Sequence, residues 1–300
     1  RQMCIRDRFD KAEINADNIL VTEEEIKEAY EEVDDELIKV IRKAIKNIRD
    51  FHEKQIQKSW FETREDGVML GQKVTPMETC GVYVPGGKAV YPSSVLMNIV
   101  PAHVAGVKNI IMTTPPGKDG KVTANTLVAA KEAGATKVYK VGGAQAIAAM
   151  AFGTESIPKV DKIVGPGNIF VALAKKAVYG NVSIDSIAGP SEILVLADET
   201  ANPRYVAADL LSQAEHDEMA SAILVTTSEE LAHKVSDEID GFLNQLSRKE
   251  IMEKSLDSFG YILVASDMKE AIDTANAIAS EHMEIMTANP FDVMTRSKNA

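Results

Sequence analysis

Between residues 81 and 178 the sequence repeats one pattern four times: a short β-rich run, a glycine-bearing turn and a helical stretch. Strand, helix and strand at this spacing form parallel pairs with right-handed crossovers. The pattern therefore predicts a doubly wound α/β lobe, with its glycine turns at the carboxyl ends of the strands, where such sheets bind ligands. The expected strands are Gly81–Val84, Asn109–Met112, Lys137–Val141 and Lys162–Val164.

The same alternation resumes after Gly189 and Pro190, which mark a junction between two series. Three further strands are expected at Glu192–Leu196, Ala222–Val225 and Tyr261–Val264, with helices at about 203–216, 228–246 and 267–279. The predicted fold class is α/β, with two Rossmann-like doubly wound lobes of largely parallel sheet facing each other across a cleft.

A helical segment precedes the first lobe. Thr22 and Glu25 have the spacing of a capping box, and apolar residues keep a helical period from Ile26 to Phe51. Asp34 and Asp35 can cap a second helix, so residues 22–59 are expected to form one helix or two.

Composition excludes several classes of partner. A net charge of −12 and a pI near 5.0 argue against nucleic acid or an anionic membrane surface. No uninterrupted apolar run reaches the roughly 18 residues of a membrane span. The two cysteines fit a reducing cytoplasm. The chain starts without Met and ends without a closing helix or strand pattern, so we expect a fragment.

Gln213 and His216 end the helix that is expected at 203–216. Their spacing of three residues puts both side chains on nearly the same side of the helix. A neutral imidazole is a good zinc ligand, and an amide oxygen beside it is a weaker, exchangeable one. Spacing alone favours a solvated helix end, because two such residues fall short of the usual number of ligands.

Glu281 and His282 are adjacent titratable residues at an element boundary. Such a pair can divide acid and base chemistry, but these two residues alone favour a charged helix C-terminus, where a protonated histidine complements the helix dipole. Cys80 precedes a strand and has no histidine near it in sequence, which favours a buried structural thiol over a nucleophile.

The glycine turns are compatible with a dinucleotide, because each leaves backbone N–H groups at a helix start. Ordinary strand-to-helix turns also use glycine, and the chain contains no Gly-x-Gly-x-x-Gly. Gln145 and Asn168 follow two of the turns and could hydrogen-bond a ribose or an amide. Both interpretations remain open at this level.

Six segments occur in a fixed order along the chain: Tyr83–Gly87, Val141–Ala149, Gly165–Asn168, Ala188–Glu192, Gln213–His216 and Ser280–Met283. Together they resemble the histidinol dehydrogenase family, and the resemblance runs from about residue 12 to the end. It implies oxidation of L-histidinol to L-histidine through an aldehyde, with two NAD⁺ and a zinc ion, in a cytoplasmic homodimer.

The resemblance assigns roles to individual residues. Gln213 and His216 match zinc ligands that also contact substrate, and Ser191 matches a further substrate contact. Glu281 matches the residue that activates water, and His282 matches the one that binds substrate and moves protons. NAD contacts are expected at Tyr83, Gln145 and Asn168. The resemblance also implies two lobes, residues 1–82 with 191–300 and an inserted lobe at 83–190.

The chain departs from the family pattern in three ways. Ser280 stands where the family usually has Pro, and Met283 where it usually has Leu. An aspartate and a second histidine that complete the family's zinc site belong to a C-terminal region that this sequence lacks. We therefore expect residues 1–300 to bind zinc poorly and to turn over little histidinol. Two other functions fit the scaffold: a dehydrogenase of another polar amino alcohol or hydroxy acid, and a non-catalytic two-lobed binding protein.

Overall fold

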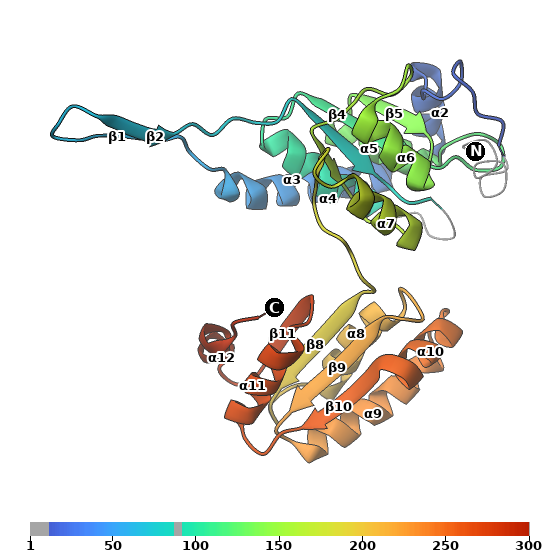
Figure 1. The fold of residues 1–300 in the computed structure, drawn as a ribbon. Helices are drawn as coiled ribbons and strands as arrows, with labels where there is room; N and C mark the ends of the chain where they lie inside the picture. The colour runs from blue at the N-terminus through green and yellow to red at the C-terminus, as the bar shows by residue number, and fades with distance from the viewer. Residues whose placement is uncertain (1–11, 87–91, 300) are drawn as a thin grey trace. The chain divides into compact units, whose positions relative to one another are not determined.

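The computed structural model describes residues 12–86 and 92–299 (Figure 1). The chain forms two compact units, Arg1–Ala188 (unit 1) and Gly189–Ala300 (unit 2). The division lies beside Gly189 and Pro190, where the sequence pattern predicts a junction.

Unit 1 is built on a five-stranded sheet in which all neighbouring strands are parallel. The spatial order is β5-β4-β3-β6-β7, so the winding reverses between β3 and β6. This order is that of a doubly wound sheet, as the alternating pattern predicts. Its strands are β3 (Thr79–Tyr83), β4 (Asn109–Thr114), β5 (Lys137–Lys140), β6 (Lys162–Val164) and β7 (Ser183–Ile184).

Helices cover both faces of this sheet. Four of them share one apolar core with β3 and β4, and two pack in a second core on the opposite face. The first group comprises α2 (Glu23–Glu32), α3 (Asp35–His52), α4 (Pro92–Val104) and α5 (Ala124–Ala133), and the second α6 (Gly143–Phe152) and α7 (Ile169–Val178).

The N-terminal segment forms two helices. Thr22 and Glu25 make the expected capping box, and Asp34 caps α3 by accepting a hydrogen bond from the amide of Glu36. The resemblance grouped residues 1–82 with 191–300, whereas α2 and α3 pack on α4 and α5 of unit 1. Their apolar stripes need an apolar surface, which α4 and α5 supply, and Arg42 pairs with Glu132 across this contact.

A β-hairpin follows α3 and the short 3₁₀ helix η1 (Glu53–Gln55). Its antiparallel strands β1 (Trp60–Thr63) and β2 (Met69–Gln72) pair with each other as a separate two-stranded sheet. The hairpin projects from the body of unit 1 (Figure 1), and every residue of both strands is exposed. The sequence pattern did not predict it.

Unit 2 contains a four-stranded parallel sheet with the order β10-β9-β8-β11. One face packs on α8, α9 and α10, and the other on α11 and α12. The strands are β8 (Glu192–Ala197), β9 (Ser221–Thr226), β10 (Gly260–Val264) and β11 (His282–Met286), and the helices are α8 (Pro203–Ala214), α9 (Glu229–Leu243), α10 (Lys249–Phe259), α11 (Met268–Ile278) and α12 (Pro290–Arg296).

The helices are amphipathic. The 18-residue α3 buries Ile38, Ile41 and Ile45 and carries charged residues on its remaining surface. No helix in the described part of the chain is long and apolar enough to cross a membrane.

Candidate functional site

The topology of unit 2 brings the expected zinc, substrate and catalytic residues to one edge of its sheet. Helix α8 follows the carboxyl end of β8 and runs antiparallel to it. The last turn of α8 therefore lies at the end of the sheet where β8 and β11 begin. Ser191 precedes β8, Glu281 precedes β11, and His282 is the first residue of β11. The sequence analysis expected ligands at the carboxyl ends of strands, but in this unit the candidate residues lie at the amino ends.

Alternation along β11 decides which helix His282 faces. Met286 packs in the core formed with α8, whereas Met283 and Ile285 pack with α11. Because side chains alternate along a strand, His282 and Glu284 share the α8 face with Met286. Glu284 also makes a side-chain hydrogen bond with Asp209 of α8.

Helix α8 presents its polar residues along the same stripe. Asp209, Gln213 and His216 follow one another at intervals of four and three residues, which puts them on one side of the helix. Since Asp209 contacts Glu284, this stripe faces the side of β11 that carries His282. Gln213 is half-buried and His216 is exposed.

The backbone of Glu192 sets the tautomer of His282. The imidazole Nδ1 lies 3.1 Å from the carbonyl oxygen of Glu192. A carbonyl can only accept, so Nδ1 carries the hydrogen and Nε2 is left as a proton acceptor. The side chain of His282 is 53% exposed, so a reactant can reach the imidazole ring.

Glu192 also positions Glu281. The amide of Glu281 donates to Oε2 of Glu192 at 3.3 Å, and Oε2 of Glu281 lies 3.8 Å from Nδ1 of His282. The adjacent pair is therefore held against the first residue of β8. Sequence reasoning missed Glu192 because it is adjacent to these residues only through the pairing of β8 with β11.

Glu284 and Asp209 form a second pair of interacting carboxyls that the sequence analysis did not single out. Burial, followed by the hydrogen bond and the negative charge of Asp209, raises the pKa of Glu284 to about 7, while His282 opposes the shift. The two carboxyls therefore hold a proton near neutral pH, two residues along β11 from His282. Asp209 lies four residues before Gln213, and Glu284 lies two residues after His282. These spacings were the only signal in the sequence that could have pointed to this pair.

Replacing Glu284 with Gln is expected to stabilise the chain more at pH 8 than at pH 5. The pKa of Glu284 in the folded state lies above the ordinary glutamate value of 4.5. The stability that Glu284 contributes is therefore present below pH 4.5 and is lost as the pH rises through about 7. Glutamine can still hydrogen-bond Asp209 and does not ionise. Thermal unfolding at both pH values measures the effect, with Glu199→Gln at an exposed glutamate of the same unit as the control. Equal gains at pH 5 and pH 8 would contradict it.

The residues present do not complete a zinc site by themselves. Gln213 and His216 offer two donors, whereas zinc is usually held by four ligands. Within residues 12–86 and 92–299, no group of three or more His, Cys, Asp or Glu side chains is placed to hold a metal ion.

The expected NAD residues of unit 1 lie where the winding of its sheet reverses. Tyr83 ends β3, Gln145 lies in the first turn of α6, and Asn168 caps α7. The amide of Gly143 donates to the Tyr83 hydroxyl at 3.0 Å, which ties the start of α6 to the end of β3. This edge is where doubly wound sheets bind nucleotides.

Gln145 and Asn168 differ in what they offer a ligand. Oε1 of Gln145 is buried and accepts no hydrogen bond within the structure described, which fits an acceptor that awaits a donor from a bound molecule. The side-chain oxygen of Asn168 accepts from the amides of Phe170 and Val171 as the cap of α7, so only its amide N–H groups remain for a cofactor. The donor and acceptor set is compatible with the hydroxyls and carboxamide of NAD.

The turn at Gly165 is fixed by a largely buried ion pair. Its amide donates to Oδ2 of Asp185 at 2.7 Å, and its carbonyl accepts from the Lys175 ammonium at 3.0 Å. Lys175 and Asp185 also pair directly with each other. This glycine turn therefore has a structural role whatever binds beside it. Of the expected turn at Pro85–Gly87, Gly87 lies outside the described residues.

Cys80 is the buried thiol that the sequence favoured. Its side chain lies in the core of unit 1, and burial raises the pKa of the thiol to about 11. Little thiolate forms near neutral pH, which argues against a nucleophilic role.

Comparison with known proteins agrees with these motifs. The family model described as histidinol dehydrogenase matches residues 3–300. The chain is 58% identical over 293 residues to the histidinol dehydrogenase of Bacillus subtilis, which covers 98% of this chain and 68% of that protein. It is 56% identical over 294 residues to that of Geobacillus kaustophilus, covering 98% of this chain and 69% of that protein.

A solved structure extends the likeness to three dimensions. The crystal structure of histidinol dehydrogenase from Elizabethkingia anophelis superposes with a TM-score of 0.95 at 40% identity, and covers 100% of this chain and 69% of that one. The matching family model and the close relatives, together with the shared fold, show that this chain belongs to the histidinol dehydrogenase family.

Proposed function

We propose that the chain provides the catalytic His–Glu pair and the NAD-contacting residues of an enzyme that oxidises L-histidinol to L-histidine through L-histidinal, as an NAD- and zinc-dependent homodimer. Family membership supports the oxidation of histidinol. The observation that carries the assignment of roles is the hydrogen bond from Nδ1 of His282 to the carbonyl of Glu192, which leaves Nε2 as a base.

In the first half-reaction His282 acts as the general base. Nε2 takes the hydroxyl proton of the substrate while a hydride leaves the carbinol carbon, and the products are an aldehyde, the transferred hydride and a protonated imidazole. The carbonyl of Glu192 holds the ring in this orientation throughout, because its bond to Nδ1–H persists in both protonation states. Bound NAD⁺ supplies the hydride acceptor for each half-reaction.

In the second half-reaction Glu281 accepts a proton from water as the water oxygen adds to the aldehyde carbon. Because Glu281 has taken that proton, the product is the anion of the aldehyde hydrate, which loses a second hydride and becomes the carboxylic acid. Glu281 is 60% exposed and held by the side chain of Glu192, so water can reach it while its backbone stays fixed.

The remaining assignments concern binding. Tyr83, Gln145 and Asn168 would hold NAD, with the buried Oε1 of Gln145 accepting from the cofactor. Ser191, beside Glu192, would contact the substrate. Gln213 and His216 would contribute two of the donors of a zinc site that other residues complete, and no chemical step is assigned to the metal here.

An assay for NADH formation tests this function. We expect a fusion of residues 1–300 to the C-terminal segment of the Bacillus subtilis relative to form two NADH per histidinol, and to lose this activity on chelation. We expect residues 1–300 alone to bind zinc weakly, as measured by titration. An unchanged rate with an amino alcohol that lacks the imidazole would point to a dehydrogenase of another substrate. Ligand binding without NADH formation would point to a binding protein.

A further inference from the structure

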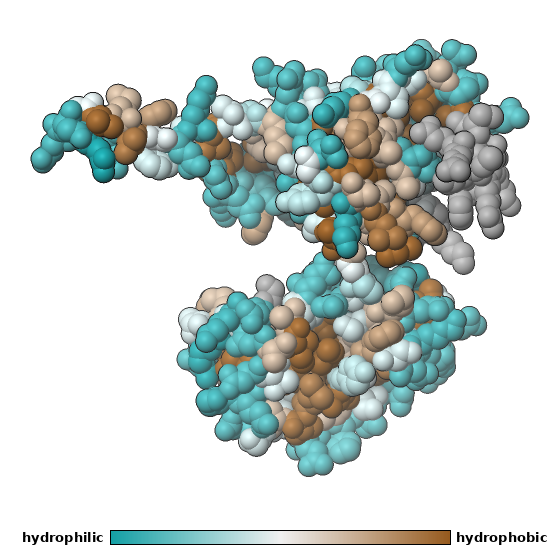
Figure 2. All heavy atoms as spheres, in the orientation of Figure 1, coloured by the Kyte–Doolittle hydropathy of each residue, from teal (hydrophilic) through white to brown (hydrophobic). Residues whose placement is uncertain are grey.

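Lys175 is buried on a helix that leaves apolar residues in water. It lies on the core-facing side of α7 with Val171 and Val178, and only 4% of its side chain is exposed. On the opposite side of α7, Ile169 and Leu173 are 63% and 54% exposed, and Figure 2 shows this apolar surface in brown. Burying an ammonium group costs free energy unless its partners offset that cost. The burial of Lys175 therefore has to be explained by its contacts.

These contacts form a closed ring around the backbone of Gly165. The Gly165 amide donates to Oδ2 of Asp185 at 2.7 Å, and the Gly165 carbonyl accepts from the Lys175 ammonium at 3.0 Å. The ammonium and Oδ1 of Asp185 pair directly and close the ring. Helical side chains lean toward the start of their helix, which lets Lys175 reach back past the first turn of α7. Since Gly165 follows β6 and Asp185 follows β7, the ring ties α7 to the ends of two strands.

The ring fixes the turn that carries Asn168. Gly165 lies three residues before Asn168, the expected NAD residue, which caps α7 through its side-chain oxygen. The direction of the remaining amide N–H groups of Asn168 therefore depends on the path of the turn. A Cβ at Gly167 would overlap the side chain of Val171, so the turn also packs closely on α7.

Lys175 and Asp185 can influence a cofactor only through this turn. The Lys175 side chain is too deeply buried to touch a bound molecule. Both carboxylate oxygens of Asp185 already accept hydrogen bonds from backbone amides of unit 1, and a carboxylate repels the pyrophosphate of a dinucleotide. The two residues thus have the contacts of a support and not of a ligand-binding pair.

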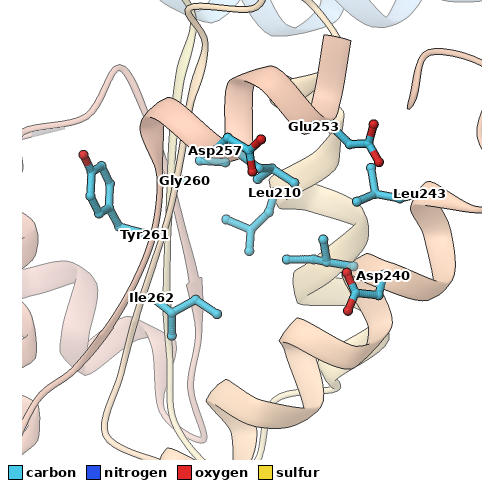
Figure 3. Close-up of a pocket in the computed structure, with 11 residues that line it drawn as sticks. Leu210, Asp240, Leu243, Glu253, Asp257, Gly260, Tyr261 and Ile262 are labelled. Atoms are coloured by element: carbon cyan, nitrogen blue, oxygen red, sulfur yellow. The ribbon is translucent and has the colours of Figure 1, made fainter. Parts of the chain in front are cut away.

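A cavity in unit 2 does not offer the cofactor an alternative site. It has a volume of about 350 Å³, which would suit a small molecule. However, Figure 3 shows the carboxylates of Asp240, Glu253 and Asp257 at its wall. These charges disfavour a pyrophosphate, whereas the starts of α6 and α7 in unit 1 favour one.

We propose that Lys175 and Asp185 are positioning residues for NAD: their ion pair holds the turn at Gly165 in the conformation in which Asn168 meets the cofactor. This inference rests on the proposed function, which places NAD on unit 1. A pair that served stability alone would be replaceable, because apolar residues of similar size often substitute for a buried ion pair without loss of stability.

The double variant Lys175→Met with Asp185→Leu separates positioning from stability. Both charges are removed together, so circular dichroism is expected to show a folded chain. The turn is no longer held, so NAD⁺ has to order it on binding. Titration calorimetry with residues 1–300 is therefore expected to show the dissociation constant of NAD⁺ rising at least about tenfold. Without NAD⁺, amide hydrogen exchange across residues 162–171 is expected to be faster than in the unmodified chain.

Lys175→Met alone is a milder form of the same test. It keeps the bond from the Gly165 amide to Asp185, whose side chain is 32% exposed and can be solvated without its partner. Its dissociation constant for NAD⁺ is expected to lie between those of the unmodified chain and the double variant. An affinity equal to that of the unmodified chain would contradict the role of Lys175, even if the double variant failed to fold.

Arg42→Met with Glu132→Leu is the matched control, because it removes another partly buried ion pair of unit 1. Glu132 lies in the last turn of α5, which leads into β5, so this pair lies toward the amino ends of the strands. Its affinity for NAD⁺ is expected to stay within about twofold of the unmodified value.

The outcomes distinguish this inference from the proposed function. If the double variant binds NAD⁺ as tightly as the unmodified chain, or if the control loses as much affinity, Lys175 and Asp185 are not positioning residues and the proposed function still stands. If the unmodified chain does not bind NAD⁺, the assignment of the cofactor to unit 1 and the inference that rests on it are both overturned.

Discussion

Replacing Gly165 with alanine is expected to cost unit 1 a large part of its stability. Gly165 has a φ of +115°, a backbone conformation that residues with a side chain rarely adopt. In addition, a Cβ added at this position would overlap the carbonyl oxygen of Tyr83. The turn cannot easily shift, because Asp185 and Lys175 hold both its amide and its carbonyl. We expect a loss of about 4 kcal/mol or more, a large part of a domain's usual 5–15 kcal/mol. Chemical denaturation followed by circular dichroism measures it.

Two other glycines separate backbone strain from the clash. Gly180 has a φ of +98° but open space around it, so Gly180→Ala is expected to cost about 1–2 kcal/mol. Gly241 lies in α9 with open space and no positive φ, so alanine there is expected to add about 0.5–1 kcal/mol. If Gly165→Ala lowers the free energy of unfolding no more than Gly180→Ala does, the turn at Gly165 can move away from β3 to make room for the added Cβ.

The buried strands were predictable because parallel sheets covered on both faces leave near-continuous apolar runs. Ile110–Met112 and Ile193–Leu196 are examples, and both are almost fully buried. Capping residues identified the helix starts equally well, as at Thr22 and at Asp34. Local chemistry decides these features, so they are visible in one sequence.

Exposed strands and element divisions were not predictable in the same way. The hairpin at 60–72 has neither an uninterrupted apolar run nor alternation with a single apolar face. The sequence pattern predicts a single helix at about 228–246. In the structure α9 ends at Leu243, and a second helix, α10, follows at Lys249–Phe259. His282 was expected at an element boundary and begins β11, so it lies on a fixed face of a sheet.

Long-range neighbours were the hardest to predict. The resemblance supplied Glu281 and His282, but their contact with Glu192 spans about 90 residues of sequence and depends on β8 lying beside β11. The Asp209–Glu284 pair depends on the same topology. The apolar stripe of α3 predicted burial without saying against which sheet it would pack.

Replacing His282 with asparagine is expected to lower kcat for histidinol by about 10²–10⁴-fold, the usual contribution of a positioned general base. The amide nitrogen of asparagine can take the place of Nδ1 and keep the hydrogen bond to the carbonyl of Glu192, while the acceptor at Nε2 is lost. Substrate binding should change less than turnover, so KM is expected to stay within a few-fold. NADH formation by the fusion with the Bacillus subtilis segment measures both constants.

Two neighbouring variants show whether this loss belongs to the imidazole. Glu192→Gln leaves the backbone carbonyl that orients His282 and keeps an acceptor for the amide of Glu281, so it is expected to change kcat only a few-fold. Glu281→Gln should slow oxidation of L-histidinal more than that of L-histidinol, because the proposed mechanism gives Glu281 the step that adds water. Rising hydroxide concentration should partly restore alcohol oxidation in the His282→Asn protein, since hydroxide can remove the proton that we propose Nε2 takes. A His282→Asn protein within tenfold of the unmodified rate at neutral pH would remove His282 from the role of base, whatever its orientation by Glu192.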